Sequence, residues 1–214
     1  MHTFPDNKLQ LYELGKDRVV AFCNANSMAI PVFKDTPAAK WRIPVCAYYR
    51  RTLREPAFID ICIYKTAFPC GVERSRCWSW PGSTIDRTPF GVMAHELGHH
   101  VDAEIMGPQH HREYGKGAIG PYYSDWSTFI MQSTGDERCF SPYAYGEGVL
   151  NCEWFAEMFR LFITNEPLLK LVAPKTWHQL INLFKPVNYS DCWITNLGKN
   201  VPPRVVQALR NKIK

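Results

Sequence analysis

The sequence predicts a single α+β domain. Two stretches in the first third of the chain, 43–49 and 58–64, are rich in β-branched and aromatic residues and are typical of strands. One helical pattern precedes them, and helical patterns dominate the chain after them. A length of 214 residues suits one domain with a sizeable core. We therefore expect one domain over 1–214, with a small mixed sheet packed on a helix and further helices in the C-terminal part.

The boundaries of the expected helices follow from capping residues and prolines. Asp6 is placed to cap a first helix that runs to about Phe22. Thr88-Pro89 opens a second helix, because proline suits the first helical position, and Met106-Gly107-Pro108 should end it. The other expected helices span 125–131, 151–164, 174–184 and 203–212.

Charge and hydropathy exclude several classes of partner. The net charge is +5, but the basic residues are scattered and form no arginine-rich run, so we expect no nucleic-acid partner. No apolar stretch reaches the roughly 18 residues that a membrane span needs. The first residues lack the basic and apolar regions of a signal peptide, which predicts a cytoplasmic protein. Secretion by a non-classical route and a trimmed N-terminus stay open, and the sequence does not give the oligomeric state.

The eight cysteines contain no C-x-x-C pair, which argues against a structural zinc ribbon. Cys46 and Cys62 lie in the strand-like stretches and are expected to be small core residues. Cys139 and Cys152 flank a loop near the expected active site, and a bridge between them is an alternative. Reduced thiols are the favoured interpretation.

The most informative motif is His95-Glu96-Leu97-Gly98-His99, an H-E-x-x-H pattern on the second expected helix. Its spacing places the two imidazoles one helical turn apart on one face, where both can bind one metal ion. Glu96 is placed to take a proton from a water on that metal. The pattern is typical of zinc-dependent hydrolases, and we expect one Zn²⁺ per chain.

The same helix has an apolar stripe and a separate polar face, which favours a built site over a chance pattern. Two glycines lie between the faces, where a neighbouring element can approach closely. The stripe is Phe90, Ala94, Leu97, Val101 and Ile105, the polar face is His95, His99 and Asp102, and the glycines are Gly91 and Gly98.

A catalytic zinc usually has three protein ligands, so one must come from another segment. Asp102 and Ile105 stand where H-E-x-x-H-x-x-G-x-x-H would need Gly and His, which excludes the metzincin pattern. His110 and His111 are more typical of a solvated pair at a helix end. Asp136 is one rival ligand.

The expected helix 151–164 offers better candidates. Glu153, Glu157, Arg160 and Thr164 share one narrow stripe, and every other face is apolar. The helix should therefore be buried, and its carboxylates need partners. Either Glu157 pairs with Arg160 while Glu153 faces solvent, or Glu153 binds zinc while Glu157 supports a zinc-bound histidine. We favour the second alternative.

Several blocks in this order resemble one family, the catalytic domain of anthrax lethal factor and the related secreted Pro-Pro endopeptidases. The resemblance covers about residues 90–185. The blocks are His95-Glu96-Leu97-Gly98-His99-His100-Val101-Asp102, Tyr145-Gly146, Glu153-Trp154-Phe155-Ala156-Glu157-Met158-Phe159-Arg160 and Ala173-Pro174-Lys175-Thr176-Trp177.

The resemblance implies a zincin-like metallopeptidase of the gluzincin type, in which His95, His99 and Glu153 bind zinc and Glu96 is the general base. It also implies that Tyr145 donates a hydrogen bond to the developing oxyanion. The chain has one extra residue between the Tyr-Gly pair and Glu153, so Tyr143 is the alternative donor.

These observations predict a zinc endopeptidase that acts on a protein or peptide, with Glu157 and Asp102 orienting the zinc-bound imidazoles. The alternatives are a zinc hydrolase of a non-peptide amide, such as cell-wall material, and a non-catalytic metal-binding interaction protein. Residues 59–64 are expected to form either the edge strand that aligns a substrate or a core strand. Trp78 and Trp80 are more typical of buried residues than of a substrate subsite.

Overall fold

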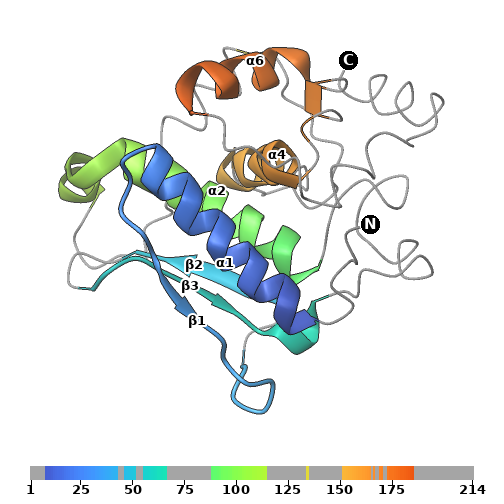
Figure 1. Cartoon of the computed structure of the whole chain (residues 1–214). Helices are drawn as coiled ribbons and strands as arrows, with labels where there is room; N and C mark the ends of the chain where they lie inside the picture. Colours follow the sequence, from blue (N-terminus) through green and yellow to red (C-terminus); the bar gives the residue numbers. More distant parts are fainter. Residues whose placement is uncertain are drawn as a thin grey trace.

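The structure is a computed structural model that describes residues 8–42, 46–51, 55–66, 88–114, 134, 151–164, 166, 169–170 and 173–185; within 106–114 and at 151 it describes the backbone alone. Its described part has a mixed α+β architecture, which confirms the expected fold class (Figure 1). The helices are α1 (Lys8–Ala25), α2 (Pro89–Tyr114), α4 (Asn151–Thr164) and α6 (Pro174–Leu183). The strands are β1 (Val32–Lys34), β2 (Ala47–Arg50) and β3 (Phe58–Ile61), and a 3₁₀ turn, η1 (Ile63–Lys65), follows β3.

The three described strands form one sheet in the order β1-β3-β2. Strand β1 runs parallel to β3, and β2 runs antiparallel to it. Every residue of β3 is buried. Residues 59–64 therefore supply a core strand, and the edge-strand alternative is wrong for them in this sheet. The extended conformation also ends at Ile61, because the chain turns through Cys62 into η1.

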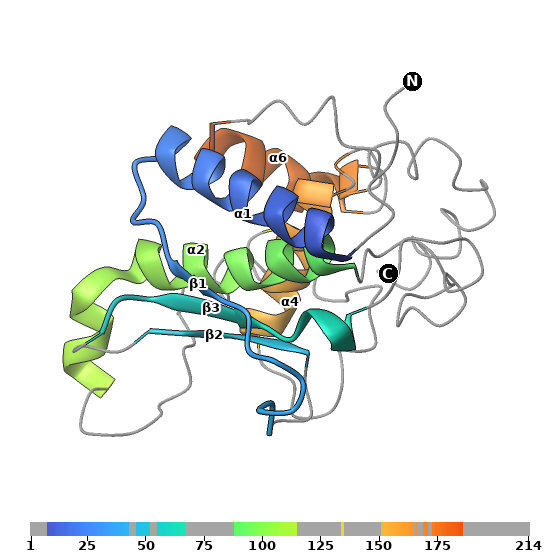
Figure 2. The same ribbon diagram turned by 60° about the horizontal axis from the view of Figure 1, so that its bottom comes forward.

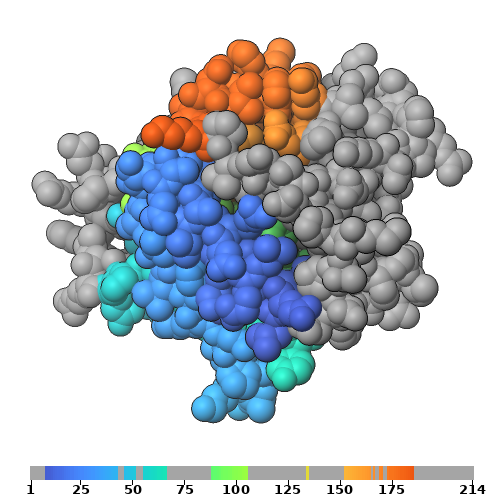
Figure 3. All heavy atoms as spheres, in the orientation of Figure 1, coloured from blue at the N-terminus to red at the C-terminus, as the bar shows by residue number. Residues whose placement is uncertain are grey.

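Helix α2 lies at the centre of the fold, between the sheet and α4. It contacts α1 on one side, β2 and β3 on another and α4 on a third. Figure 1 shows the sheet on one side of α1 and α2, with α4 and α6 on the other, and Figure 2 shows α2 between α1 and the sheet. Figure 3 shows that α1 and the segment after it cover most of α2 in that view. The expected apolar stripe of α2 is buried from Phe90 to Val101, whereas Ile105 is exposed.

Two glycines allow the helices to approach α2 closely. A Cβ atom on Gly98 would lie 2.7 Å from the Cα atom of Ala156 on α4, so a side chain there would meet backbone. A Cβ atom on Gly15 of α1 would lie 3.0 Å from the Cβ atom of Met93. The contact at Gly98 holds α2 and α4 at the short distance that lets their polar faces meet.

Helix boundaries agree with expectation for α4 and nearly so for α1 and α6. The expected end of α2 is wrong, because the helix continues through Gly107-Pro108 to Tyr114. A proline removes one helical hydrogen bond and costs about 3 kcal/mol, but it does not forbid the next turn. Asp6 and the expected helices 125–131 and 203–212 lie outside the described residues.

Among the helices that the structure describes, none has both the length and the apolar character needed to cross a membrane. The structure has no disulfide among the described cysteines, which are Cys23, Cys46, Cys62 and Cys152. Cys152 is buried on α4, so the alternative of a bridge between it and Cys139 is wrong for this structure. Cys62 is buried and Cys46 is half-buried, in accord with small residues packed in and beside the core.

Candidate metal centre

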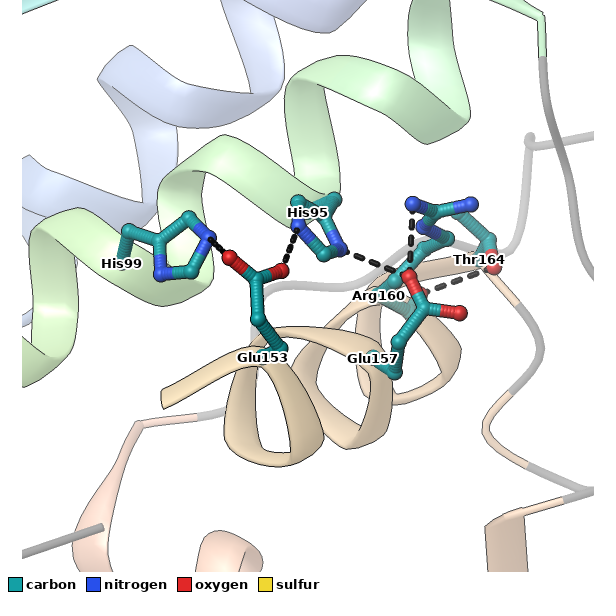
Figure 4. Close-up of polar contacts among 6 residues, drawn as sticks. All are labelled: His95, His99, Glu153, Glu157, Arg160 and Thr164. Atoms are coloured by element: carbon teal, nitrogen blue, oxygen red, sulfur yellow. Dashed lines mark hydrogen bonds and ion pairs between the residues drawn. The ribbon is translucent and has the colours of Figure 1, made fainter. Parts of the chain in front are cut away.

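Three side chains from two helices converge where α2 crosses α4. His95 and His99 extend from α2, and Glu153 extends from the first turn of α4 to a position between them (Figure 4). One ligand atom from each residue lies within 4.8 Å of the others. The H-E-x-x-H spacing thus places its two imidazoles on one face, as expected, and α4 brings a carboxylate to the same point.

Each histidine nitrogen lies at a distance from one Glu153 oxygen that is close to the spacing of neighbouring ligands around a tetrahedral ion. His95 Nε2 lies 3.2 Å from Glu153 Oε2, and His99 Nε2 lies 3.5 Å from Glu153 Oε1. Zinc bonds of about 2.0–2.1 Å in tetrahedral geometry place neighbouring ligand atoms about 3.4 Å apart. The two nitrogens and one carboxylate also form a donor set that zinc prefers.

The second nitrogen of His95 has its own partner. Nδ1–H donates to Glu157 Oε1 at 2.6 Å, and the same oxygen lies 2.6 Å from Arg160 Nη2. All three residues are buried, and Figure 4 shows them in line behind Glu153. Arg160 balances the Glu157 charge, so this carboxylate can stay ionised inside the protein. Glu157 in turn fixes the ring orientation of His95 and leaves Nε2 toward Glu153.

The structure agrees in part with each of the two interpretations of Glu153 and Glu157 on α4. Glu157 does pair with Arg160, as the purely structural interpretation requires, but it also accepts a hydrogen bond from His95. The Glu153 side chain is only 24% exposed and lies between the two histidines rather than in solvent. The stripe on α4 is therefore a continuous polar path inside an otherwise apolar helix.

Electrostatics in this group favour a positive charge near Glu153. Burial and the Arg160 charge lower the pKa of His95, but hydrogen bonds to Glu153 and Glu157 outweigh them and raise it to about 9. Burial raises the pKa of Glu153, yet His99 and His95 lower it well below its ordinary value. The site without metal thus holds an ionised carboxylate against a protonated imidazole, which a divalent cation can replace.

Glu96 and Asp102 flank the ligands on α2, and both are buried. Burial raises the pKa of Glu96, against the opposing charges of His95 and His99. The Asp102 carboxylate acts electrostatically on the Cys152 thiol, which places it near the start of α4. It lies one turn beyond His99, and its role in orienting that imidazole stays a prediction.

Sequence reasoning missed the buried contacts that hold the opposite face of α2. His100 Nε2–H donates to the Ala29 carbonyl at 2.7 Å, and His100 Nδ1 lies 3.4 Å from the Tyr49 hydroxyl. Burial lowers the pKa of His100, so its imidazole is neutral. Arg51 pairs with Glu104 and donates to the Ala103 carbonyl. No local pattern could indicate these partners, because each is more than 50 residues away in the chain from the α2 residue that it contacts.

Several expected site residues lie outside the described part of the chain. They include both candidate oxyanion donors and the rival metal ligand, and two histidines of α2 whose side chains are not described. These residues are Tyr143, Tyr145, Asp136, Trp78 and Trp80, together with His110 and His111.

Comparison with protein-family models, with curated proteins and with solved structures finds no match to the chain. The metal centre therefore stands on the geometry and chemistry of its own residues.

Proposed function

We propose that the protein is a zinc-dependent endopeptidase of the gluzincin type, with a zincin-like fold. The observation that carries the proposal is the convergence of His95, His99 and Glu153, with the buried Glu96 next to His95 on the same helix. Two imidazoles and one carboxylate leave one position of a tetrahedral zinc open, as catalytic sites do.

The surroundings of the three ligands support this assignment. Glu157 accepts a hydrogen bond from the Nδ1–H of His95, and zinc-bound histidines usually have such a partner. Arg160 balances the Glu157 charge, and the Thr164 hydroxyl donates to the Arg160 carbonyl at 2.8 Å. Of the three proposed ligands, His95 is buried, whereas the side chains of His99 and Glu153 are 16% and 24% exposed.

Zinc, when bound, would supply Lewis acidity that activates water near neutral pH and polarises the scissile carbonyl. The chain's own residues would do the rest. Glu96 would accept a proton from the attacking water and pass it to the leaving amine. Glu157 would hold His95 in one tautomer, Asp102 would orient His99, and Tyr145 would donate to the oxyanion, with Tyr143 as its alternative.

Glu96 favours an enzyme over a structural metal site. A structural zinc is normally closed by four protein ligands and needs no carboxylate base beside it. Burying a carboxylate is costly unless it has partners or a use. Its burial beside the two histidines therefore supports a catalytic role for this residue.

The test compares wild type with Glu96→Gln and with a matched control, Glu104→Gln. Glu104 is on the same helix but pairs with Arg51, away from the ligands. We expect about one zinc per chain in all three proteins and cleavage of a chemically unfolded protein by wild type and Glu104→Gln. Glu96→Gln should lose about 10²–10⁴-fold of the turnover, because it keeps the shape but not the base.

Equal turnover in Glu96→Gln and wild type would remove Glu96 from the mechanism. Wild-type protein that carries one zinc but cleaves neither the unfolded protein nor a proteome-derived peptide library would contradict the endopeptidase. That result would favour the non-catalytic alternative, and absence of zinc would contradict the metal centre itself.

A further inference from the structure

Two cysteines face each other across the antiparallel strands β2 and β3. The register pairs Ala47 with Ile61, so the next pair along the ladder is Cys46 with Cys62. The Cys62 N–H donates to the Cys46 carbonyl at 2.9 Å, which places the two residues directly opposite each other. Side chains of directly opposed residues lie on the same face of a sheet.

This pairing brings the thiols within reach of a disulfide. Residues directly opposite each other on antiparallel strands have Cα atoms about 4.5–5.5 Å apart, and disulfides join Cα atoms about 4.4–6.8 Å apart. The pair also lies at the end of the ladder, where Cys62 begins the turn into η1. A ladder end can adjust by a few tenths of an ångström more easily than its middle.

The two thiols differ in accessibility in the way that a reactive pair requires. Cys46 is half-buried, so a small oxidant can reach it, whereas Cys62 is fully buried behind it. Cys23 on α1 is fully buried, and burial raises its pKa to about 12. Accessibility thus selects Cys46 as the first thiol to react and Cys62 as the second.

We propose that Cys46 and Cys62 form a reversible dithiol–disulfide pair that reacts with small disulfides of the glutathione type. Cys46 thiolate attacks glutathione disulfide, which forms a mixed disulfide at Cys46 and releases one glutathione thiol. Cys62 thiolate then attacks the Cys46 sulfur, forms the Cys46–Cys62 bond and releases a second glutathione thiol. The two protein thiols are oxidised, and one glutathione disulfide is reduced.

The bond would fix β2 to the central strand of the sheet. Strand β2 and the residue after it contact α2 through Tyr49 and Arg51, so the bridge would anchor the strand that supports the central helix. It would close a short loop over 46–62, which restricts the unfolded chain. Oxidation should therefore raise the thermal stability of the protein without any change in its contacts elsewhere.

Mass spectrometry of a tryptic digest of the whole protein tests the Cys46–Cys62 bond directly. Arg50, Arg51 and Arg54 lie between the two cysteines, so trypsin separates peptide 43–50 from peptide 55–65. After treatment with glutathione disulfide and digestion without reductant, we expect these two peptides joined, with the loss of two hydrogen atoms. The Cys23 peptide should stay unmodified in the same digest. In a series of glutathione redox buffers, both thiols should titrate with one common midpoint.

Melting temperatures give a second readout that does not depend on digestion. We expect oxidised wild type to melt about 5–10 °C above the reduced form, from the loop size and the length of the chain. The melting temperatures of the oxidised and reduced forms are compared within each variant, so any loss of stability caused by the substitution itself cancels. Cys46→Ser and Cys62→Ser should lose the shift, whereas Cys23→Ala should keep it.

Three results would overturn the proposal. The first is a reaction in which Cys46 forms only the mixed disulfide with glutathione and Cys62 stays reduced. The second is a bridge from either residue to a different cysteine. The third is a stability shift on oxidation that survives in both Cys46→Ser and Cys62→Ser.

Discussion

Replacing Gly98 by alanine should separate the two helices that carry the proposed ligands. The new Cβ atom would lie 2.7 Å from the Ala156 Cα atom, 3.1 Å from the Phe159 Cβ atom and 3.3 Å from the Ala156 Cβ atom. Carbon atoms in contact prefer about 3.5–4.0 Å. Because the nearest atom belongs to backbone, no side-chain rotation can relieve the contact, and α2 and α4 must move apart by about 0.8 Å.

This displacement should affect both stability and metal binding. Overpacking costs about 1–3 kcal/mol. Alanine recovers about 1 kcal/mol of helix propensity relative to glycine. We expect a net loss of about 1 kcal/mol and a melting temperature about 2–4 °C lower. Glu153 would also move away from His95 and His99, which are now 3.2 and 3.5 Å away, and zinc affinity should fall by about 10-fold or more.

Gly15→Ala is the matched comparison. Its Cβ atom would meet the Met93 side chain at 3.0 and 3.2 Å, and a methionine side chain can adjust. Thermal denaturation gives the stability of each variant, and chelator competition gives the zinc affinity. Gly15→Ala should cost less stability and keep the zinc affinity. Wild-type stability and zinc affinity in Gly98→Ala would refute the close crossing of α2 and α4.

Two further predictions concern the partners of His95. Glu157→Gln should lower zinc affinity by about 10–100-fold, because it removes the negative charge that faces His95 Nδ1 and leaves the charge of Arg160 without its partner. An unchanged zinc affinity in this variant would show that Glu157 does not support His95. Zinc binding near pH 7.5 should release a proton from His95, whose pKa is about 9 without metal, so affinity should rise about tenfold per pH unit until about pH 9. Calorimetry in buffers of different ionisation enthalpy measures that proton, and a pH-independent affinity would contradict it.

The same raised pKa predicts how the metal-free fold responds to pH. The protonated His95 stabilises the fold fully below about pH 6.5, its ordinary pKa, and this contribution is lost as pH rises through about 9.

The local sequence pattern predicted those helices and strands whose conformation depends mainly on their own residues. The mostly apolar α4 has helical spacing along its whole length, and its boundaries are those of the expected helix. The H-E-x-x-H motif and the α4 carboxylates were found because helical spacing alone sets which residues share a face. Their meeting required a contact between α2 and α4, for which Gly91 and Gly98 were the local signs, and the structure places Gly98 against α4.

Features that depend on distant partners could not be predicted. The central place of β3 depends on β1, a strand of three residues that pairs only once the chain has folded back on itself. The end of β3 at Ile61 was missed because Cys62, Ile63 and Tyr64 continue the same apolar and aromatic pattern. The end of α2 was misplaced because a helix with many tertiary contacts can tolerate a proline that would end an isolated one.

The most direct test of the account is X-ray diffraction from crystals of the zinc-loaded protein, measured on both sides of the zinc absorption edge. The account predicts one anomalous peak per chain, about 2.0–2.2 Å from His95 Nε2, His99 Nε2 and a Glu153 carboxylate oxygen. A peak bound by other residues, or none at this crossing of α2 and α4, would contradict it.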